Sequence, residues 1–551
     1  MDILRNIYTS YYNYCPDKPD VTYPKVSLDS YGINPIQKNI ATYKNIYDNM
    51  RKKRMPLMLT MLLLSLIVPS AASSQAKREF RGAWIQCVNG QFLGMSTERM
   101  QQTLANQLDV LKADGCNAII FQVRPECDAL YDSKLEPWSR FLTGRQGQRP
   151  EPYWDPLRWM VAECHKRGME LHAWINPYRA KTKTTRELSP SHITMRHPER
   201  VFPYDGQMIL NPALSENRQY ICDVVRDIVS RYDIDGLHMD DYFYPYPAAG
   251  QTIPDAADYR RDNNGINNIA DWRRYNVSMF VKEVSDVIHR TKPWVKFGIS
   301  PFGIYRNIAS DPQNGSRTKG LQNYDDLYAD VLLWVNNGWI DYCVPQLYWQ
   351  IGHPTADYAE LIAWWSRYCS KRPLFIGEDI ERTAKYPDPN NPNQNQMAPK
   401  MALHRKMRNV HGTVLWYAKA AVDNIGNYGK MLREVYWKTP ALQPRMTFIS
   451  SKTPGKVKKV KAMDIDGKKV LFWTAPKASS WETTPTRYVV YAFDKGQRVD
   501  TENPANIMAI TSDTFIDLPE YTSKCKKVYV VTALNRIDNE SKAVKKKVSF
   551  K

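Results

Sequence analysis

Eight short apolar segments, each followed by a helical stretch, occupy the chain between residues 77 and 440. The segments predicted as strands are 81–86, 117–124, 170–179, 234–243, 296–305, 341–349, 373–381 and 412–418. One intervening helix has clear ends. Asp155 suits the N-cap, Pro156 suits the first helical position, and Gly168 suits the C-terminal end. Eight alternating strand and helix units predict an α/β fold, a (β/α)8 TIM barrel. A doubly wound open sheet is the alternative, but no glycine-rich phosphate loop follows the first strand.

The chain beyond the barrel has a different pattern. Segment 437–445 contains two prolines and is typical of a linker. Three alternating apolar runs follow it, at 468–476, 486–493 and 526–534, separated by turn-rich stretches. This pattern predicts an all-β sandwich over 441–551, after a barrel domain over 77–440. The sandwich contains no catalytic constellation, so we expect a role in binding or spacing.

Residues 50–76 have the order of an export signal: four basic residues, an apolar run and a stretch of small residues. Cleavage is expected after Ala72 or Ala76, and the apolar run is short for a transmembrane span. No cysteine follows at a lipid-attachment position, so we expect a soluble periplasmic or secreted protein with no span left after cleavage. Residues 1–49 precede this signal and show no sustained periodicity. We interpret them as a non-native upstream extension.

The formal net charge of +19 is concentrated near the C-terminus. Residues 442–551 contain 21 Lys and Arg but 11 Asp and Glu, and the chain ends in KAVKKKVSFK. On an exported protein this distribution favours contact with anionic envelope polymers over nucleic acid, and a solvated charged face is the simpler alternative. The nine cysteines show neither metal-ligand spacing nor a disulfide framework. We therefore expect no metal and no cofactor.

Polar and aromatic side chains gather where the predicted strands end, which is the active face of a TIM barrel. Side chains alternate along a strand, so apolar Ala173, Ile175, Leu237 and Met239 should face the helices and their neighbours the lumen. The side chains expected in the lumen or at its rim are His172, Trp174, Asn176, His238, Asp240, Asp241, Ser300, Gln346 and Tyr348. The second strand adds Arg124, Glu126 and Asp128.

Most of these residues have a structural alternative. Arg124 could form an ion pair with Glu126 or Asp128, the two histidines could be hydrogen-bonded barrel residues, and Trp174 or Tyr348 could belong to the core. Asp240 differs, because no structural need places a carboxylate in the lumen at the active face. We predict a functional role for Asp240.

Six sequence blocks, in order, resemble a known family. They are RGAW, VRPECDALYDS, HAWINPYR, DGLHMDDYFYP, ISPFGIYRN and VPQLYW. They resemble the glycosyl-hydrolase-like family ten of bacterial envelope proteins over residues 80–440, and the tail is similar to a fibronectin type III module. The resemblance implies a TIM barrel that cleaves peptidoglycan glycan strands, particularly strands stripped of stem peptides. It carries over no catalytic residue beyond the acids of DDYFYP.

Glycoside hydrolysis uses two carboxyl groups, one to protonate the leaving oxygen and one to attack or to activate water. Asp240 can supply one group, as nucleophile or base. For the other, strand parity favours Asp379, a bulge would favour Glu378, and Asp241 and Glu126 are further alternatives. The chitinase-like pattern DGxDxDxE is not matched, because His238 and Tyr242 stand at two of its acidic positions.

The leading hypothesis is therefore an exported glycoside hydrolase that acts on bacterial cell-wall glycan. The side chains expected to line sugar subsites are Trp174, Tyr178, Tyr242, Tyr244, Tyr348 and Trp349. Arg179 and Arg306 are expected to meet substrate carboxylates, such as those of muramic acid. The alternatives are a non-catalytic glycan-binding protein and a hydrolase of host or dietary polysaccharide.

Overall fold

A computed structural model of the chain describes residues 75–521 and 524–550. The upstream extension and all but the last two residues of the export signal lie outside the described residues.

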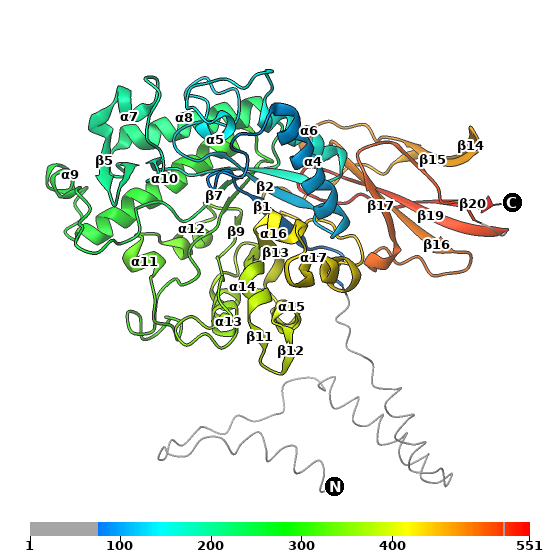
Figure 1. The fold of residues 1–551 in the computed structure, drawn as a ribbon. Helices are drawn as coiled ribbons and strands as arrows, with labels where there is room; N and C mark the ends of the chain where they lie inside the picture. The colour runs from blue at the N-terminus through cyan, green and yellow to red at the C-terminus, as the bar shows by residue number, and fades with distance from the viewer. Residues whose placement is uncertain (1–74, 522–523, 551) are drawn as a thin grey trace, which may run out of the picture. The chain divides into compact units, whose positions relative to one another are not determined.

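Eight parallel strands form a closed barrel, which confirms the predicted fold class (Figure 1). Around the barrel the strand order is β1-β13-β10-β9-β8-β7-β3-β2. The strands are β1 (Phe80–Ile85), β2 (Ala118–Arg124), β3 (Glu170–Ile175), β7 (Gly236–Met239), β8 (Lys296–Ile299), β9 (Tyr342–Cys343), β10 (Leu374–Asp379) and β13 (Val410–Trp416). Each lies within a predicted segment or within two residues of one. Several end before the polar residues of the active face, which therefore stand in the following loops.

Helices cover the outside of the barrel. They are α4 (Thr97–Ala113), α6 (Pro156–Lys166), α8 (Ser215–Arg231), α10 (Ile269–Thr291), α12 (Val331–Asn337), α13 (Tyr358–Tyr368), α15 (Met397–Lys406), α16 (Ala418–Val422) and α17 (Tyr428–Met431). The cap predicted for α6 is present, because the Asp155 carboxylate accepts a hydrogen bond from the backbone N–H of Arg158 at 3.1 Å. Gly168 follows this helix with a φ of +67°, which suits glycine.

Two separate cores confirm the predicted alternation of side chains. Ala173, Ile175, Leu237 and Met239 lie in the large core between the strands and the helices. The barrel interior is filled by a second cluster, in which Phe80, Trp84, Ile120, Trp174, Tyr342, Val344, Phe375 and Val414 are buried. The lumen is therefore a packed core, as small barrels require.

Insertions between strands and helices build the rim of the active face. After β3 come β4 (Arg179–Lys181), α7 (Ile193–Arg196), η1 (Pro198–Arg200), β5 (Val201–Tyr204) and β6 (Gln207–Leu210), where the three strands form one small sheet. The other short elements are α5 (Arg140–Thr143), α9 (Ala256–Arg261), α11 (Asn323–Asp326), α14 (Ile380–Lys385), β11 (Pro387–Asp388), β12 (Asn391–Asn395), η2 (Ile425–Asn427) and η3 (Leu432–Tyr436).

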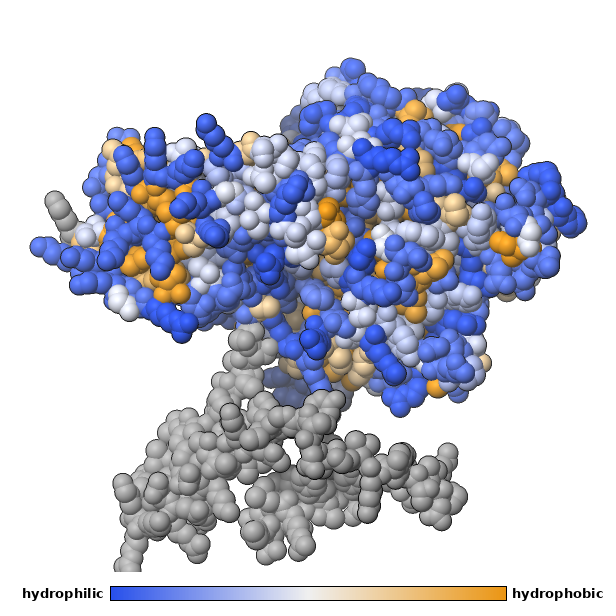
Figure 2. All heavy atoms as spheres, turned by 180° about the vertical axis from the view of Figure 1, so that it is seen from behind, coloured by the Kyte–Doolittle hydropathy of each residue, from blue (hydrophilic) through white to orange (hydrophobic). Residues whose placement is uncertain are grey.

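The C-terminal part forms two antiparallel sheets that share a core, as predicted. One sheet contains β14 (Lys458–Ile465), β15 (Lys468–Thr474) and β18 (Phe515–Asp517). The other contains β17 (Ile507–Thr511), β16 (Arg487–Asp494), β19 (Cys525–Leu534) and β20 (Val544–Phe550). Two short 3-10 turns, η4 (Trp481–Thr483) and η5 (Pro504–Asn506), complete this domain. Seen from behind, its surface combines hydrophilic side chains with apolar patches (Figure 2).

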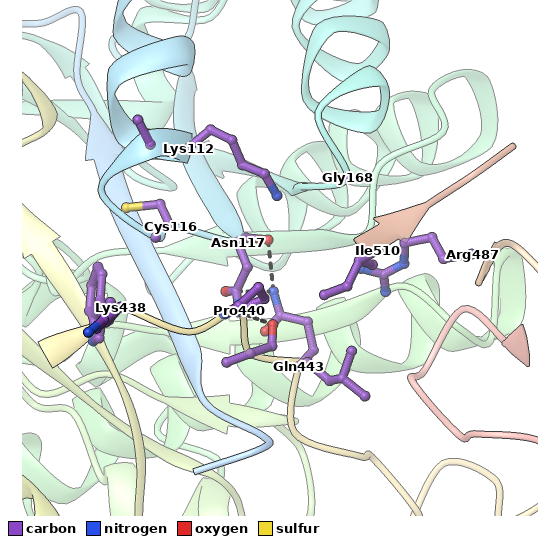
Figure 3. A pocket seen from close by; sticks show the side chains of 14 residues that line it. Lys112, Cys116, Asn117, Gly168, Lys438, Pro440, Gln443, Arg487 and Ile510 are labelled. Atoms are coloured by element: carbon purple, nitrogen blue, oxygen red, sulfur yellow. Dashed lines mark hydrogen bonds between the residues drawn. The ribbon is translucent and has the colours of Figure 1, made fainter. Parts of the chain in front are cut away.

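The sandwich closes the end of the barrel opposite the active face. Met446 and Ile537, which lie outside the barrel strands, belong to the same buried cluster as Phe80 and Tyr342 in the lumen. A cavity of about 170 Å³ remains at this junction, where Arg487 and Gln443 approach the start of β2 (Figure 3). The sandwich therefore has a structural role that the sequence did not predict. The loop between β19 and β20, which contains Ile537, fills the lower mouth of the barrel.

Within the described residues, no helix is both long and apolar enough to cross a membrane. The same residues contain no group of three or more His, Cys, Asp or Glu side chains that could hold a metal ion.

Candidate active site

Asp240 follows β7 directly and lies at the active face of the barrel. Its side chain is 5% exposed. One carboxylate oxygen, Oδ2, accepts a hydrogen bond from the Asn176 amide, which follows β3. The other, Oδ1, is buried and has no hydrogen-bond partner among the described residues. Because a buried carboxylate oxygen without a partner is costly, Oδ1 is the natural point of contact for a substrate hydrogen-bond donor or for a proton.

The amide of Asn176 is oriented by two donors. Its Oδ1 accepts hydrogen bonds from Gln122 Nε2 and from Arg179 Nη2, each at 2.7 Å. The amide nitrogen is therefore turned towards Asp240, because the oxygen is already occupied. Gln122, on β2, was missed by the sequence analysis, although it shares the lumen side with Ile120. Arg179 is fixed in turn by the carbonyl of Pro125 at 3.0 Å.

Two acidic side chains with raised pKa values stand side by side here. Burial raises the pKa of the Asp240 carboxyl to about 7, the charge of Asp241 adds to the rise, and Arg179 opposes it. Burial also raises the pKa of Asp241, although the Tyr246 hydroxyl donates a hydrogen bond to this carboxylate. A carboxyl group that titrates near neutral pH is suited to proton transfer.

His238 and Ser300 form the floor beneath Asp240. The His238 Nε2 atom lies 2.9 Å from Ser300 Oγ and 3.3 Å from the indole nitrogen of Trp84. His172 lies deeper, between Tyr342 and Glu170. Both histidines are fully buried, so the structure favours the alternative that they are hydrogen-bonded barrel residues over direct sugar contact.

Glu378 does not face the lumen. Phe375 belongs to the lumen cluster, and a Cβ atom on Gly377 would meet Trp84, so these alternate residues of β10 point inwards. Glu378 points towards the helices, where its carboxylate contacts Lys400 Nζ at 2.6 Å and the Tyr358 hydroxyl at 2.8 Å. The alternative in which a bulge turns Glu378 inwards is wrong. The one register shift between β10 and β13 lies before Phe375, and the pairing is regular from Phe375 to Asp379.

Asp379, which strand parity favours for the lumen, stands at the rim, where β10 ends and α14 begins. Its carboxylate caps α14 by accepting a hydrogen bond from the Arg382 backbone N–H at 2.9 Å, and it lies 3.4 Å from the Arg382 guanidinium. Burial raises its pKa. Capping occupies one carboxylate oxygen of Asp379, whereas Asp240 keeps a free one.

The acidic loop after β2 is a structural support. Arg124 pairs with Glu136 at 2.6 Å, with both side chains fully buried, and donates to the carbonyls of Asn176 and Pro177. The ion-pair partners predicted for Arg124 were therefore wrong. Glu126 binds Thr185 at 2.7 Å, and Asp128 accepts from Gln146 at 3.0 Å. All three predicted residues are buried, and Arg124 reaches the site only through the backbone next to Asn176.

Two of the predicted sugar-facing tyrosines are instead buried in the helical layer. Tyr178 packs on Phe280 with ring centroids 5.0 Å apart, and Tyr244 on Tyr328 at 5.2 Å. The order of residues alone could not show that the chain turns outwards at these two positions.

Other aromatic side chains do line the mouth. Tyr242 is 37% exposed and stacks on Tyr246, with 5.3 Å between centroids. Tyr348 stacks on Trp416 at 6.0 Å, and Trp174 meets the same indole at 6.3 Å. Trp416 and Tyr246 were not among the predicted residues.

The remaining predicted residues lie around this mouth. Gln346 donates to the Ser300 carbonyl at 2.9 Å, and Trp349 packs edge-on to Phe302 at 5.5 Å. Arg306 is engaged by Asp325 at 2.8 Å, so its guanidinium is not free for a substrate carboxylate.

A cavity of about 270 Å³ opens against Arg179 and Tyr246. These two side chains contact Asn176 and Asp241, respectively, and so connect the cavity to the acidic pair. Its lining comes from the small sheet after β3 and from the loop after β7, and includes Arg179, Lys183, Gln207, Tyr242 and Tyr246. Tyr178 and Tyr244 also border this cavity, although neither has exposed surface. Aromatic faces next to hydrogen-bonding side chains are typical of sugar-binding sites.

The family model described as "Glycosyl hydrolase-like 10" matches residues 79–397. The chain belongs to this family. It is 38% identical to the glycosyl hydrolase YngK of Bacillus subtilis over 489 residues, which cover 87% of this chain and 95% of that protein. It is 37% identical to the glycosyl hydrolase DigH of Escherichia coli K12 over 332 residues, 56% of this chain and 75% of that one. The protein is thus a glycosyl hydrolase, as the sequence blocks implied.

Among solved structures, the glycoside hydrolase domain of PgaB (BpsB) from Bordetella bronchiseptica aligns with 65% of this chain and 99% of that chain. The TM-score is 0.42 and the identity 12%.

Proposed function

We propose that the protein is an exported enzyme that hydrolyses glycosidic bonds in bacterial cell-wall glycan, with Asp240 as proton donor. The observation that carries the catalytic part is the state of Asp240. It is held by one oxygen, free at the other, and has a pKa raised to about 7 by burial and by the neighbouring Asp241. Near neutral pH such a group can keep its proton until the leaving oxygen takes it, which favours the proton donor over the nucleophile.

Asp241 is the second carboxyl group in this proposal. Among the alternatives, Glu378 is bound beneath the helices, Glu126 is bound in a loop, and Asp379 caps a helix. Asp241 remains at the rim, supported by the Tyr246 hydroxyl. In hydrolysis the proton of Asp240 passes to the glycosidic oxygen as the bond to the anomeric carbon breaks, and the Asp241 carboxylate stabilises the positive charge that develops there. A water molecule then forms the new bond to this carbon, and the proton it loses restores the protonated Asp240.

Three substitutions test this pairing. Asp241→Asn is expected to lower kcat by about a hundredfold or more, because the second carboxylate is lost. Asp379→Asn and Glu378→Gln are the matched controls, and neither is expected to lower kcat more than a few fold in a folded protein. A hundredfold loss confined to Asp379→Asn would transfer the second role to Asp379. NMR of the anomer that forms first in the wild-type reaction would show whether the configuration at the anomeric carbon is retained or inverted.

The substrate class rests on the export signal predicted at 50–76 and on the resemblance of the sequence blocks. The stacked Tyr242 and Tyr246 rings beside the acidic pair support an extended glycan as ligand. The test is a panel of intact peptidoglycan, peptide-stripped glycan strands, chitin and plant polysaccharides, with mass spectrometry of the products. We expect cleavage of the stripped strands. Binding without cleavage would favour a glycan-binding protein, and cleavage of plant polysaccharide alone would favour a dietary substrate.

A further inference from the structure

A continuous run of buried polar side chains follows the interior of the barrel below Asp240. We call this set the axial column; its members, from bottom to top, are Glu170, His172, Tyr342, His238 and Ser300. His172 Nε2 lies 3.1 Å from Glu170 Oε2, and His172 Nδ1 lies 2.7 Å from the Tyr342 hydroxyl. The same hydroxyl lies 3.1 Å from His238 Nδ1, and His238 Nε2 lies 2.9 Å from Ser300 Oγ. None of the five is more than 2% exposed.

Trp84 decides which way the hydrogen bonds of the column run. Its indole nitrogen lies 3.3 Å from His238 Nε2, and an indole N–H can only donate. His238 Nε2 must therefore carry a lone pair, which also accepts the hydrogen of the Ser300 hydroxyl. The hydrogen of the His238 ring is then on Nδ1, where it is donated to the oxygen of Tyr342.

The rest of the column follows from this assignment. The Tyr342 hydroxyl, having accepted from His238, donates its own hydrogen to His172 Nδ1. His172 then carries its hydrogen on Nε2 and donates it to the Glu170 carboxylate. In this assignment each hydrogen bond of the column has one donor and one acceptor. With all directions reversed, His238 Nε2 would carry a hydrogen that points at the indole N–H of Trp84. The His238 ring is neutral, and burial agrees with this by holding its pKa well below its ordinary value.

Charged groups from the barrel and from the sandwich stabilise the foot of the column. The Glu170 carboxylate contacts Lys296 at 2.5 Å and Arg487, from β16, at 3.3 Å. Arg487 is held in turn by Asp538 at 2.8 Å, next to the Ile537 side chain that fills the lower lumen. Burial opposes ionisation of Glu170, but Lys296, the hydrogen bond from His172 and Arg487 hold its pKa at about 2. The acceptor at the foot therefore stays charged.

We infer that His238 is a positioning residue for the reaction, held by the axial column as the neutral Nδ1–H tautomer beneath Asp240. Alternate residues of a strand are about 7 Å apart, so His238 lies one layer below the acid. A neutral ring with its lone pair on Nε2 fixes both Ser300 and Trp84 as donors to it. It also keeps positive charge away from Asp240, where an imidazolium would favour loss of the proton. The role rests on the proposed function of Asp240, whereas the tautomer does not.

The first test needs no activity. Histidine labelled with 15N in the ring nitrogens is expected to show His238 neutral and protonated on Nδ1 between pH 5.5 and 7.5, a window of roughly one unit either side of an ordinary histidine pKa. The hydrogen between His172 and Glu170 is expected on His172 Nε2. His238→Gln and His172→Gln assign the signals. A charged His238 ring, or the opposite tautomer at either position, would overturn the inference, whatever the substrate proves to be.

The second test breaks the column at its centre. Tyr342→Phe keeps the ring but removes the hydroxyl that joins the two histidines, so His238 loses its Nδ1 acceptor. We expect the His238 Nδ1 signal to shift, because its hydrogen loses its acceptor while Trp84 still requires a lone pair on Nε2. We expect kcat to fall about tenfold, with KM within about twofold, because the effect reaches the chemistry and not substrate binding.

The matched control is Tyr131→Phe. Tyr131 is equally buried, but it lies in the helical layer, and its hydroxyl has no hydrogen-bond partner among the described residues. We expect this variant to keep kcat and the His238 signal unchanged. Equal kcat values for Tyr342→Phe and Tyr131→Phe would refute the positioning role, and so would an unaltered His238 signal in Tyr342→Phe.

Discussion

Replacing Arg124 by methionine separates structural support from sugar binding, the two roles open to this residue. Methionine keeps much of the side-chain length and removes the charge. In the folded protein Arg124 makes three contacts with Glu136, at 2.6, 2.8 and 3.0 Å, and donates to the carbonyls of Asn176 and Pro177 at 2.6 and 3.0 Å. Neither charged side chain reaches solvent.

The expected cost follows from the carboxylate left behind. Removing one partner of a fully buried ion pair typically costs about 3–5 kcal/mol, because the other charge stays buried without compensation. The Tyr220 hydroxyl, 2.9 Å from Glu136, offsets only part of this. We therefore expect Arg124→Met to lower the free energy of unfolding of the barrel by about 3–5 kcal/mol. Adding Glu136→Gln should restore at least about 1 kcal/mol, because the uncompensated charge is gone.

Urea unfolding followed by tryptophan fluorescence measures the stability, and KM on a cleaved glycan measures binding. The structural account predicts a large loss of stability with KM within about threefold at a temperature where the variant is folded. An unchanged unfolding midpoint with a tenfold rise in KM would refute the structural role and indicate that Arg124 binds the substrate.

Three further predictions concern pH and the junction with the sandwich. The pH profile of kcat/KM should contain an ionisation near 7 from Asp240. In Asp241→Asn the charge that raises this pKa is gone, so the ionisation measured in the residual activity should move to lower pH. The pKa of Glu170 is about 2 in the folded protein against an ordinary value of 4.5. The stability that Glu170 contributes should therefore be present above pH 4.5 and lost as the pH falls towards 2. Glu170→Gln should flatten this part of the plot of unfolding free energy against pH. Ile537→Ala should cost about 2–5 kcal/mol of stability, measured by urea unfolding, although Ile537 lies in the sandwich. A loss below about 0.5 kcal/mol would mean that the loop does not support the barrel.

The barrel was predictable because its signals are local. Alternating strands and helices predicted the fold, and strand parity placed Ala173 and Leu237 outside and Asp240 and Asp379 at the inner face. These inferences need only the two-residue period of a strand. Gln122 obeys the same parity and could have been found with it.

The missed features depend on contacts that no period encodes. Glu136 stands 12 positions after Arg124 in an irregular loop, so nothing local distinguished it from Glu126. Tyr178 and Tyr244 follow strands whose chains turn outwards, which periodicity does not describe. The entry of Ile537 into the barrel joins residues far apart in sequence and was not foreseeable from either segment.

The most direct test of the central claim is the activity of Asp240→Asn on peptide-stripped glycan strands, measured by mass spectrometry of the released fragments. Asparagine keeps the shape of the side chain but cannot donate the carboxylic proton. The thermal unfolding midpoint should stay close to that of the wild type, because an amide replaces a carboxyl group whose pKa burial has raised to about 7. We expect a loss of kcat of at least about a hundredfold. Wild-type rates of fragment release by folded Asp240→Asn would contradict the account.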